Sequence, residues 1–158
     1  MGALLRGDDE IKRGTSPVRL HIVAHGRIGR GPEADLVDRY LKRIVWPLTL
    51  TELSDSGGGK PPDLATPAVT ILLDERGAAL SSRAFADRLA AWRDDGMREA
   101  RFVIGPADGH GDAVRAAATL LLSFGPATWP HLLVRAMLAE QLFRATSLLA
   151  GHPYHRDG

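Results

Sequence analysis

The stretch AVTILLD, residues 68–74, is the most continuous apolar run in this chain that turn-forming residues bound on both sides. It follows a glycine- and proline-rich loop, residues 54–67, and precedes the turn ERGAALS at residues 75–81. An apolar run without alternation is typical of a strand that is buried on both faces of a parallel sheet. The sequence therefore predicts a central buried strand over residues 68–74.

Outward from this strand, strand-like and helix-like segments alternate along the chain. Further strands are expected at Arg19–His25, Pro47–Leu53 and Arg101–Gly105. Helices are expected at residues 31–44, Ser82–Asp95, Asp112–Leu121 and His131–Ala150. Within the second of these helices, an apolar stripe predicts the core residues Phe85, Leu89 and Trp92. The alternation implies an α/β fold, a mainly parallel sheet with helices on both faces.

The composition is that of one globular domain without cysteine chemistry. The chain has 158 residues, no cysteine and a formal net charge of +1. The lack of cysteine excludes disulfides, thiolate metal sites and a cysteine nucleophile; it fits a cytoplasmic protein, and no metal is expected. No apolar run reaches the roughly 18 residues of a membrane span, so no membrane partner is expected. A general nucleic-acid binder is usually more basic, so any RNA contact must be local.

The N-terminal segment, residues 1–17, is set apart from the rest by its composition. It is polar and contains Gly7, Gly14 and Pro17. We interpret it as a disordered extension, a tag remnant or an over-long gene start, because it lacks the apolar core of a signal peptide. The predicted domain then covers residues 18–158.

Parallel sheets bind ligands at the carboxyl ends of their strands, and the first loop there is HGRIGRG, residues 25–31. Its glycines, followed by Glu52 at the end of the next strand, are similar to a dinucleotide-binding motif. Their G-x-x-G-x-G spacing differs from G-x-G-x-x-G, which favours a plain strand-to-helix turn. A nicotinamide-dependent oxidoreductase remains an alternative on this motif.

Two later loops are better candidates for a ligand site. In IGPADGH, residues 104–110, Gly105 has no Cβ and lets a ligand approach the backbone, although a tight turn would also need glycine. In LSFGPATWPHLLVR, residues 122–135, two prolines interrupt regular structure and leave backbone N–H and C=O groups free. Such groups, framed by Leu122 and Phe124, can recognise an adenine; the alternative is a plain connector.

Six segments in this order carry a resemblance to a known family: LLDERG at 72–77, FVIG at 102–105, LSF at 122–124, TWPHLLVR at 128–135, LAEQLFRA at 138–145 and GHPYHR at 151–156. Together they resemble the ribosomal RNA large subunit methyltransferase H family over residues 18–156. Members are small SPOUT-type enzymes that use S-adenosylmethionine to methylate N3 of a pseudouridine in a 23S rRNA stem-loop.

The resemblance implies a C-terminal trefoil knot that holds S-adenosylmethionine, and a homodimer whose reaction site draws on both subunits. The positions that match the family's cofactor site are Leu73, Gly105, Leu122, Ser123, Phe124, Gly125, Pro126 and Ala127. The resemblance also implies that the C-terminal tail helps to build the active site.

The tail residues and one residue of the last helix are therefore the catalytic candidates: Tyr154, His155, Arg156 and His131. The N3–H of pseudouridine must lose its proton, and a neutral imidazole can accept it. A tyrosine can stack on a base, and an arginine can hold a phosphate or a developing negative charge. Arg135, one turn after His131, is a secondary candidate, and which group is the base stays open. Alternatively, Arg135, Glu140 and Arg144 form a charge network on one helix face, with Glu140 and Arg144 at i, i+4.

Two departures from the family limit the inference. Pro106 stands where many relatives have a second glycine, and it removes one backbone N–H from the expected cofactor site. The loop 54–67 is short and has Lys60 as its only cation, where relatives carry a lysine-rich stretch. The sequence therefore predicts a methyltransferase that needs the assembled ribosome, with a non-catalytic ribosome-binding factor as an alternative.

Overall fold

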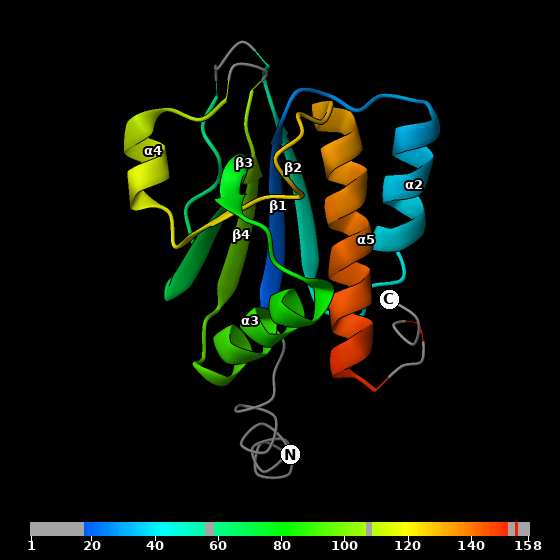
Figure 1. Ribbon diagram of the computed structural model, residues 1–158, viewed down its shortest axis with the longest axis vertical. Helices are drawn as coiled ribbons and strands as arrows, with labels where there is room; N and C mark the ends of the chain where they lie inside the picture. The colour runs from blue at the N-terminus through cyan, green and yellow to red at the C-terminus, as the bar shows by residue number, and fades with distance from the viewer. Residues whose placement is uncertain (1–17, 56–58, 107–108, 152–153, 155–158) are drawn as a thin grey trace, which may run out of the picture.

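The computed structural model describes residues 18–55, 59–106, 109–151 and 154 (Figure 1). The tail candidates His155 and Arg156 and the N-terminal segment 1–17 lie outside the described residues. The elements, in chain order, are β1 Arg19–His25, α2 Pro32–Leu41, β2 Leu48–Leu53, β3 Ala68–Ala78, α3 Ser82–Asp94, β4 Glu99–Ile104, α4 Asp112–Ala117, β5 Leu120–Leu122 and α5 His131–Leu149.

The strands form one sheet in the order β2-β1-β4-β3-β5, and every neighbouring pair is parallel. The predicted parallel α/β sheet is therefore confirmed. β3 lies between β4 and β5, and Ile71 and Leu72 have no solvent exposure, so the stretch 68–74 is an internal strand as expected.

Helices cover both faces of this sheet. In the strand order, the crossovers β1–α2–β2 and β3–α3–β4 both run towards the β2 edge of the sheet. The crossover β4–α4–β5 runs towards the opposite edge. Because such crossovers are right-handed, α2 and α3 lie on one face and α4 on the opposite face. α5 packs against α2 and α3, and it stands beside them in Figure 1.

The hydrophobic core lies between the sheet and the helices α3 and α5. Ile22, Phe102 and Ile71 are in register on three adjacent strands and are all fully buried. Phe85 of α3 packs edge-on against Phe102, with ring centroids 5.9 Å apart. The predicted core residues Phe85, Leu89 and Trp92 are confirmed.

On the opposite face, a buried polar cluster takes the place of an apolar layer. The Glu99 carboxylate is fully buried and accepts hydrogen bonds from Arg101 Nε at 2.8 Å and from the Ala65 N–H at 3.0 Å. His21 Nδ1 lies 3.0 Å from the same carboxylate. The loop between β2 and β3 is thus held against the sheet by polar contacts, such as the one between Ala65 and Glu99.

The predicted helix Asp112–Leu121 is wrong in its second half. The helix α4 ends at Ala117, and residues 120–122 form β5, which pairs with β3 from Ile71 to Leu73. A three-residue apolar run has no periodicity that separates a strand from the end of a helix. Residues 120–122 form a strand because they pair with the open edge of β3. This pairing gives hydrogen-bond partners to backbone N–H and C=O groups that would otherwise be buried without them.

The predicted turn at residues 75–81 is also partly wrong, because β3 continues to Ala78. Its pairing with β5 breaks after Leu73 and resumes at Ala78 opposite Leu122, which is a bulge. A Cβ on Gly77 would lie 2.5 Å from the backbone of Leu121, so only glycine fits at this crossing. Bulges redirect side chains, and the residues inside this one line the pocket described below.

No helix in the described part of the chain is long and apolar enough to span a lipid bilayer. The trefoil knot stays a prediction that the resemblance implies.

Candidate active site

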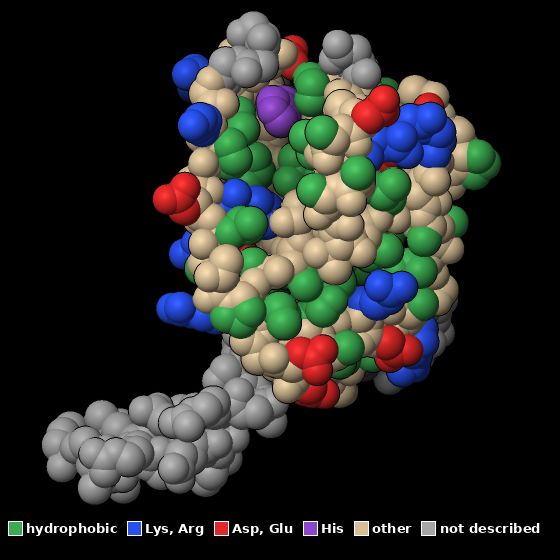
Figure 2. Space-filling view, turned by 90° about the vertical axis from the view of Figure 1, so that its left-hand side faces the viewer, with side chains coloured by type: hydrophobic (Ala, Val, Ile, Leu, Met, Phe, Trp, Pro, Cys, Tyr) green, Lys and Arg blue, Asp and Glu red, His purple; other side chains and the backbone are tan. Residues whose placement is uncertain are grey.

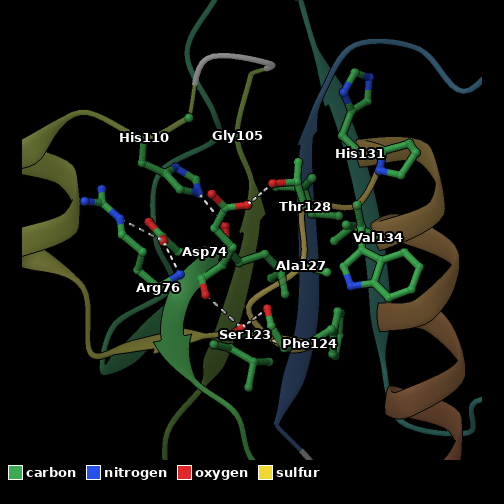
Figure 3. Close-up of a pocket in the computed structure, with 18 of the residues that line it drawn as sticks. Asp74, Arg76, Gly105, His110, Ser123, Phe124, Ala127, Thr128, His131 and Val134 are labelled. Atoms are coloured by element: carbon green, nitrogen blue, oxygen red, sulfur yellow. Dashed lines mark hydrogen bonds and ion pairs between the residues drawn. The ribbon is translucent and has the colours of Figure 1, made fainter.

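A pocket of about 700 Å³ opens where β3, β4 and β5 end and α5 begins (Figure 3). This volume is in the range of sites that bind a cofactor-sized molecule. The walls come from four parts of the chain that are far apart in sequence: residues 73–76, residues 104–106 with 109–110, residues 122–125 with 127–130, and the first turn of α5. The carboxyl ends of three parallel strands thus form one site, as the sheet topology requires.

The bulge in β3, between Leu73 and Ala78, contributes fixed carboxylates. Asp74 accepts hydrogen bonds from Arg115 Nε and from the Arg76 N–H, both at 2.8 Å. Burial alone would raise the pKa of Asp74, but the hydrogen bond from the Arg76 N–H and the charge of Arg115 lower it overall. Glu75 accepts a hydrogen bond of 2.8 Å from the Thr128 hydroxyl. The charge of Asp74 is thus compensated by Arg115, and Glu75 adds a second carboxylate to this side of the pocket.

The end of β4 brings an imidazole against a glycine. A Cβ on Gly105 would lie 2.7 Å from Cε1 of His110, so this position has no room for a larger residue. His110 Nε2 lies 3.0 Å from the Leu73 carbonyl oxygen. Because a carbonyl oxygen only accepts, Nε2 is the protonated ring nitrogen and donates this hydrogen bond. Burial lowers the pKa of His110, which keeps the ring neutral near pH 7. Figure 3 shows His110 across the pocket from His131.

The loop after β5 is held in place by Ser123. Its buried hydroxyl lies 2.8 Å from the Gly125 carbonyl and accepts a hydrogen bond of 2.9 Å from the Gly125 N–H. Gly125 has φ of 110°, a conformation that side chains disfavour. The irregular segment is therefore a defined turn that presents its backbone to the pocket.

Comparison with known proteins shows the family of this chain. A sequence profile described as "Predicted SPOUT methyltransferase" matches residues 18–155. A Rhizorhabdus wittichii protein named ribosomal RNA large subunit methyltransferase H is 69% identical and covers 88% of this chain and 99% of its own length. The chain belongs to the ribosomal RNA large subunit methyltransferase H family.

Further comparisons agree with this SPOUT methyltransferase assignment. A protein of the same name from Novosphingobium aromaticivorans is 63% identical over 88% of this chain and 99% of its own length. The structure of a probable methylase family protein from Haemophilus influenzae matches with a TM-score of 0.53 and 11% identity, over 86% of this chain and 67% of that one. At that identity the structural likeness concerns the fold alone.

The structure brings most of the predicted site residues of this methyltransferase together. The predicted cofactor positions that line the pocket are Leu73, Gly105, Leu122, Ser123, Phe124, Gly125 and Ala127; Pro126 is not among the lining residues. His131, a catalytic candidate, also lines the pocket.

Tyr154 lies elsewhere, against the middle of α5. Its hydroxyl donates a hydrogen bond of 2.9 Å to Glu140 Oε2, and its ring centroid is 4.7 Å from that of Phe143. Burial, and then the hydrogen bond to Glu140, raise the pKa of Tyr154 to about 12. Glu140 and Arg144 form the expected i, i+4 pair, at 2.6 Å. Tyr154 therefore does not line the pocket of its own chain.

The glycine-rich loop after β1 serves the fold of this methyltransferase. Glu52 accepts hydrogen bonds from the Ile28 N–H at 3.0 Å and from Arg135, whose side chain is buried. Arg135 also donates to the Gly26 carbonyl at 3.0 Å. The carboxylate that a dinucleotide ribose would need is already bound, so the plain-turn interpretation is favoured.

Sequence reasoning missed several lining residues, above all His110, Asp74 and Thr128. A histidine in the loop after a parallel strand is a signal that could have identified His110. Asp74 and Thr128 carry no such signal, because only the bulge in β3 and the turn at Ser123 bring them to the pocket.

Proposed function

We propose that this chain transfers a methyl group from S-adenosylmethionine to N3 of a pseudouridine in a 23S rRNA stem-loop. The observation that carries the proposal is the pocket formed by the ends of β3, β4 and β5, in a chain that belongs to the ribosomal RNA large subunit methyltransferase H family. The names of its relatives state an RNA substrate, and the finer specificity rests on the resemblance.

The residues present fit S-adenosylmethionine. Leu73, Leu122 and Phe124 offer apolar contacts for an adenosyl group, and the lack of a Cβ at Gly105 leaves backbone within reach. Glu75, a carboxylate that lines the pocket, complements a cationic sulfonium, while Asp74 is paired with Arg115. When bound, the cofactor supplies an electrophilic methyl group; the chain's own task is to hold it and to exclude water.

Proton removal from the base falls to residues around the pocket mouth. His131 lines the pocket at the start of α5 and can accept a proton or hold a water molecule that does. His155 and Arg156 remain proposed as the proton acceptor and as the group that stabilises negative charge on the base carbonyls. Transfer requires that the N3–H be lost as the methyl group arrives.

The tail of one protomer serves the pocket of its partner in this proposal. Tyr154 binds Glu140, which lies nine residues beyond His131 on α5. At 1.5 Å per residue, Glu140 is about 13 Å along the helix from His131 and about 9 Å from Val134, which also lines the pocket of its own chain. α5 also carries partly exposed apolar side chains, Leu133 and Met137, that a second copy can cover.

The test has a binding arm and a transfer arm. We expect calorimetry to detect S-adenosylhomocysteine binding to the dimer, and labelled cofactor to methylate ribosomes that lack this modification, with the label mapped to one pseudouridine. A folded dimer that binds no S-adenosylhomocysteine would refute the proposal. A monomeric mass in solution would refute the shared site.

The substrate is proposed to be the assembled ribosome. Figure 2 views the side where α4 lies in Figure 1, and it shows Lys and Arg side chains at separate places, without one continuous basic patch. With a net charge of +1 for the whole chain, we expect weak affinity for free RNA and a need for a rigidly presented stem-loop. Equal turnover on a short naked hairpin would contradict this.

A second candidate is a ribosome-binding factor without catalysis. Pro106 lines the pocket and supplies no N–H, which is the observation that favours it. Such a factor would bind ribosomes but not S-adenosylhomocysteine, so the binding arm separates the two candidates.

A further inference from the structure

The Glu140 carboxylate is saturated with hydrogen bonds from four donors on three side chains. Oε2 accepts from Arg144 Nε at 3.0 Å, from the Arg144 terminal nitrogen at 2.6 Å and from the Tyr154 hydroxyl at 2.9 Å. Oε1 accepts from Gln141 Nε2 at 2.9 Å, and Gln141 Oε1 in turn accepts from Ser82 at the start of α3. Arg144 and Gln141 therefore hold the carboxylate in one orientation independently of Tyr154.

The ring of Tyr154 is held as firmly as its hydroxyl. The Arg144 guanidinium carbon lies 4.9 Å from the ring centroid, within the range of a cation–π contact. Phe143 packs on the ring at 4.7 Å between centroids, and Tyr40 of α2 packs on Phe143 at 6.0 Å. These contacts come from α2 and α5, so the position of Tyr154 is set by the folded domain.

We propose that Glu140 is a positioning residue, which anchors Tyr154 to α5 so that the tail is held in one place for the reaction. Glu140 and Arg144 together are called the tyrosine clamp. The clamp assigns Tyr154 the role of an anchor instead of a stacking partner for the RNA base. The inference rests on the proposed function, because it names how that function's tail is positioned.

The physical reason is chain geometry. Successive Cα atoms are about 3.8 Å apart, so a fixed residue limits the space that its chain neighbours can reach. An unanchored tail would have to lose backbone entropy each time it reached the site. A clamp removes that cost in advance and raises the rate of transfer without touching the cofactor.

Two substitutions separate an anchor from a stacking partner. Glu140→Gln keeps the size of the side chain but removes the charge, and Tyr154→Phe keeps the ring but removes the hydroxyl. Tyr154→Phe removes the donor of this hydrogen bond, and Glu140→Gln replaces its charged acceptor with a neutral amide and so weakens it. If Tyr154 is an anchor, each change should lower kcat on ribosomes about tenfold or more, with KM for S-adenosylmethionine within twofold. The double variant should be no worse than the worse single variant, because the two changes remove one shared interaction.

Asp87→Asn is the matched control. Asp87 is an exposed carboxylate on α3, and its loss of charge should leave kcat unchanged. A third readout does not depend on activity. In Glu140→Gln the pKa of Tyr154, about 12 in the parent protein, should fall towards the ordinary value near 10, as followed by ultraviolet absorbance with Tyr154→Phe as the blank.

The outcomes are distinguishable. Full activity of both single variants, with loss of activity only in Tyr154→Ala, would overturn the clamp and restore stacking on the base. An unchanged Tyr154 pKa in Glu140→Gln would overturn the contact itself. Failure of the parent protein to bind S-adenosylhomocysteine would refute the proposed function and not the contact between Tyr154 and Glu140. If Glu140→Gln fails to fold, Tyr154→Phe, which loses one oxygen atom, still gives the kinetic answer.

Discussion

Glu52 holds the β1–α2 loop, β2 and α5 together, and its replacement by glutamine gives a test of how the site is supported. Glu52 accepts hydrogen bonds from Arg135 and from the Ile28 N–H. The Arg135 side chain is 1% exposed and Glu52 is 30% exposed. Glu52→Gln keeps both acceptor contacts possible but leaves the buried guanidinium without a counter-charge.

The magnitude follows from the two exposures. Breaking a fully buried ion pair costs about 3–5 kcal/mol, and breaking a fully exposed one costs about 0–1 kcal/mol. This pair is buried on one side and partly hydrated on the other, and glutamine keeps part of the hydrogen bonding. We therefore expect a loss of about 1–2 kcal/mol at pH 7, which lowers Tm by about 3–8 °C in a domain of this size.

The loss should depend on pH. Burial would raise the pKa of Glu52, but the hydrogen bonds from Arg135 and Ile28 lower it overall. A lowered pKa means that the stabilisation is present above the unfolded value of 4.5 and disappears as pH falls through the folded value. The difference between the parent and Glu52→Gln should thus be constant from pH 6 to 8 and shrink below about pH 4.5.

The assay is urea or thermal unfolding of both proteins at equal concentration, across that pH range. Asp38→Asn is the control, because Asp38 and Lys42 form an exposed pair on α2 that should contribute less than about 0.5 kcal/mol. Equal stability of Glu52→Gln and the parent at pH 7, or a difference that persists unchanged at low pH, would show that the pair does not support the fold.

Three further outcomes are expected. Gly105→Ala should weaken S-adenosylhomocysteine binding more than tenfold in calorimetry, because its Cβ would lie 2.7 Å from His110; unchanged affinity would mean that the ring simply moves aside. Gly77→Ala should lower the unfolding free energy by about 2 kcal/mol or more, because its Cβ would lie 2.5 Å from the Leu121 backbone; a Tm equal to the parent's would contradict the close crossing. Truncation after Gly151 should abolish methyl transfer while S-adenosylhomocysteine still binds, and parallel loss of binding would show that the tail supports the pocket.

Local sequence determined the elements whose signals are self-contained. The apolar run 68–74, bounded by turn-forming residues, indicated a buried strand, and the stripe of Phe85, Leu89 and Trp92 indicated which side of α3 is buried. The loops after the strands were recognisable because glycine and proline restrict the backbone in ways that few structures accommodate. For the same reason Gly105 was identifiable as a point of close approach, although the group that approaches it, His110, was not.

Tertiary structure decided whatever depends on partners distant in sequence. Leu120–Leu122 is a strand because β3 offers it a backbone edge, and the bulge at Gly77 exists because β5 crosses there. Arg135 forms its ion pair with Glu52 and not with Glu140 further along α5. The Tyr154 hydroxyl donates to Glu140, and Tyr154 does not line the pocket of its own chain. Pairings of this kind are set by the packing of α5 against the sheet and α2, because one sequence pattern is compatible with several partners until the fold places a single one within hydrogen-bond distance.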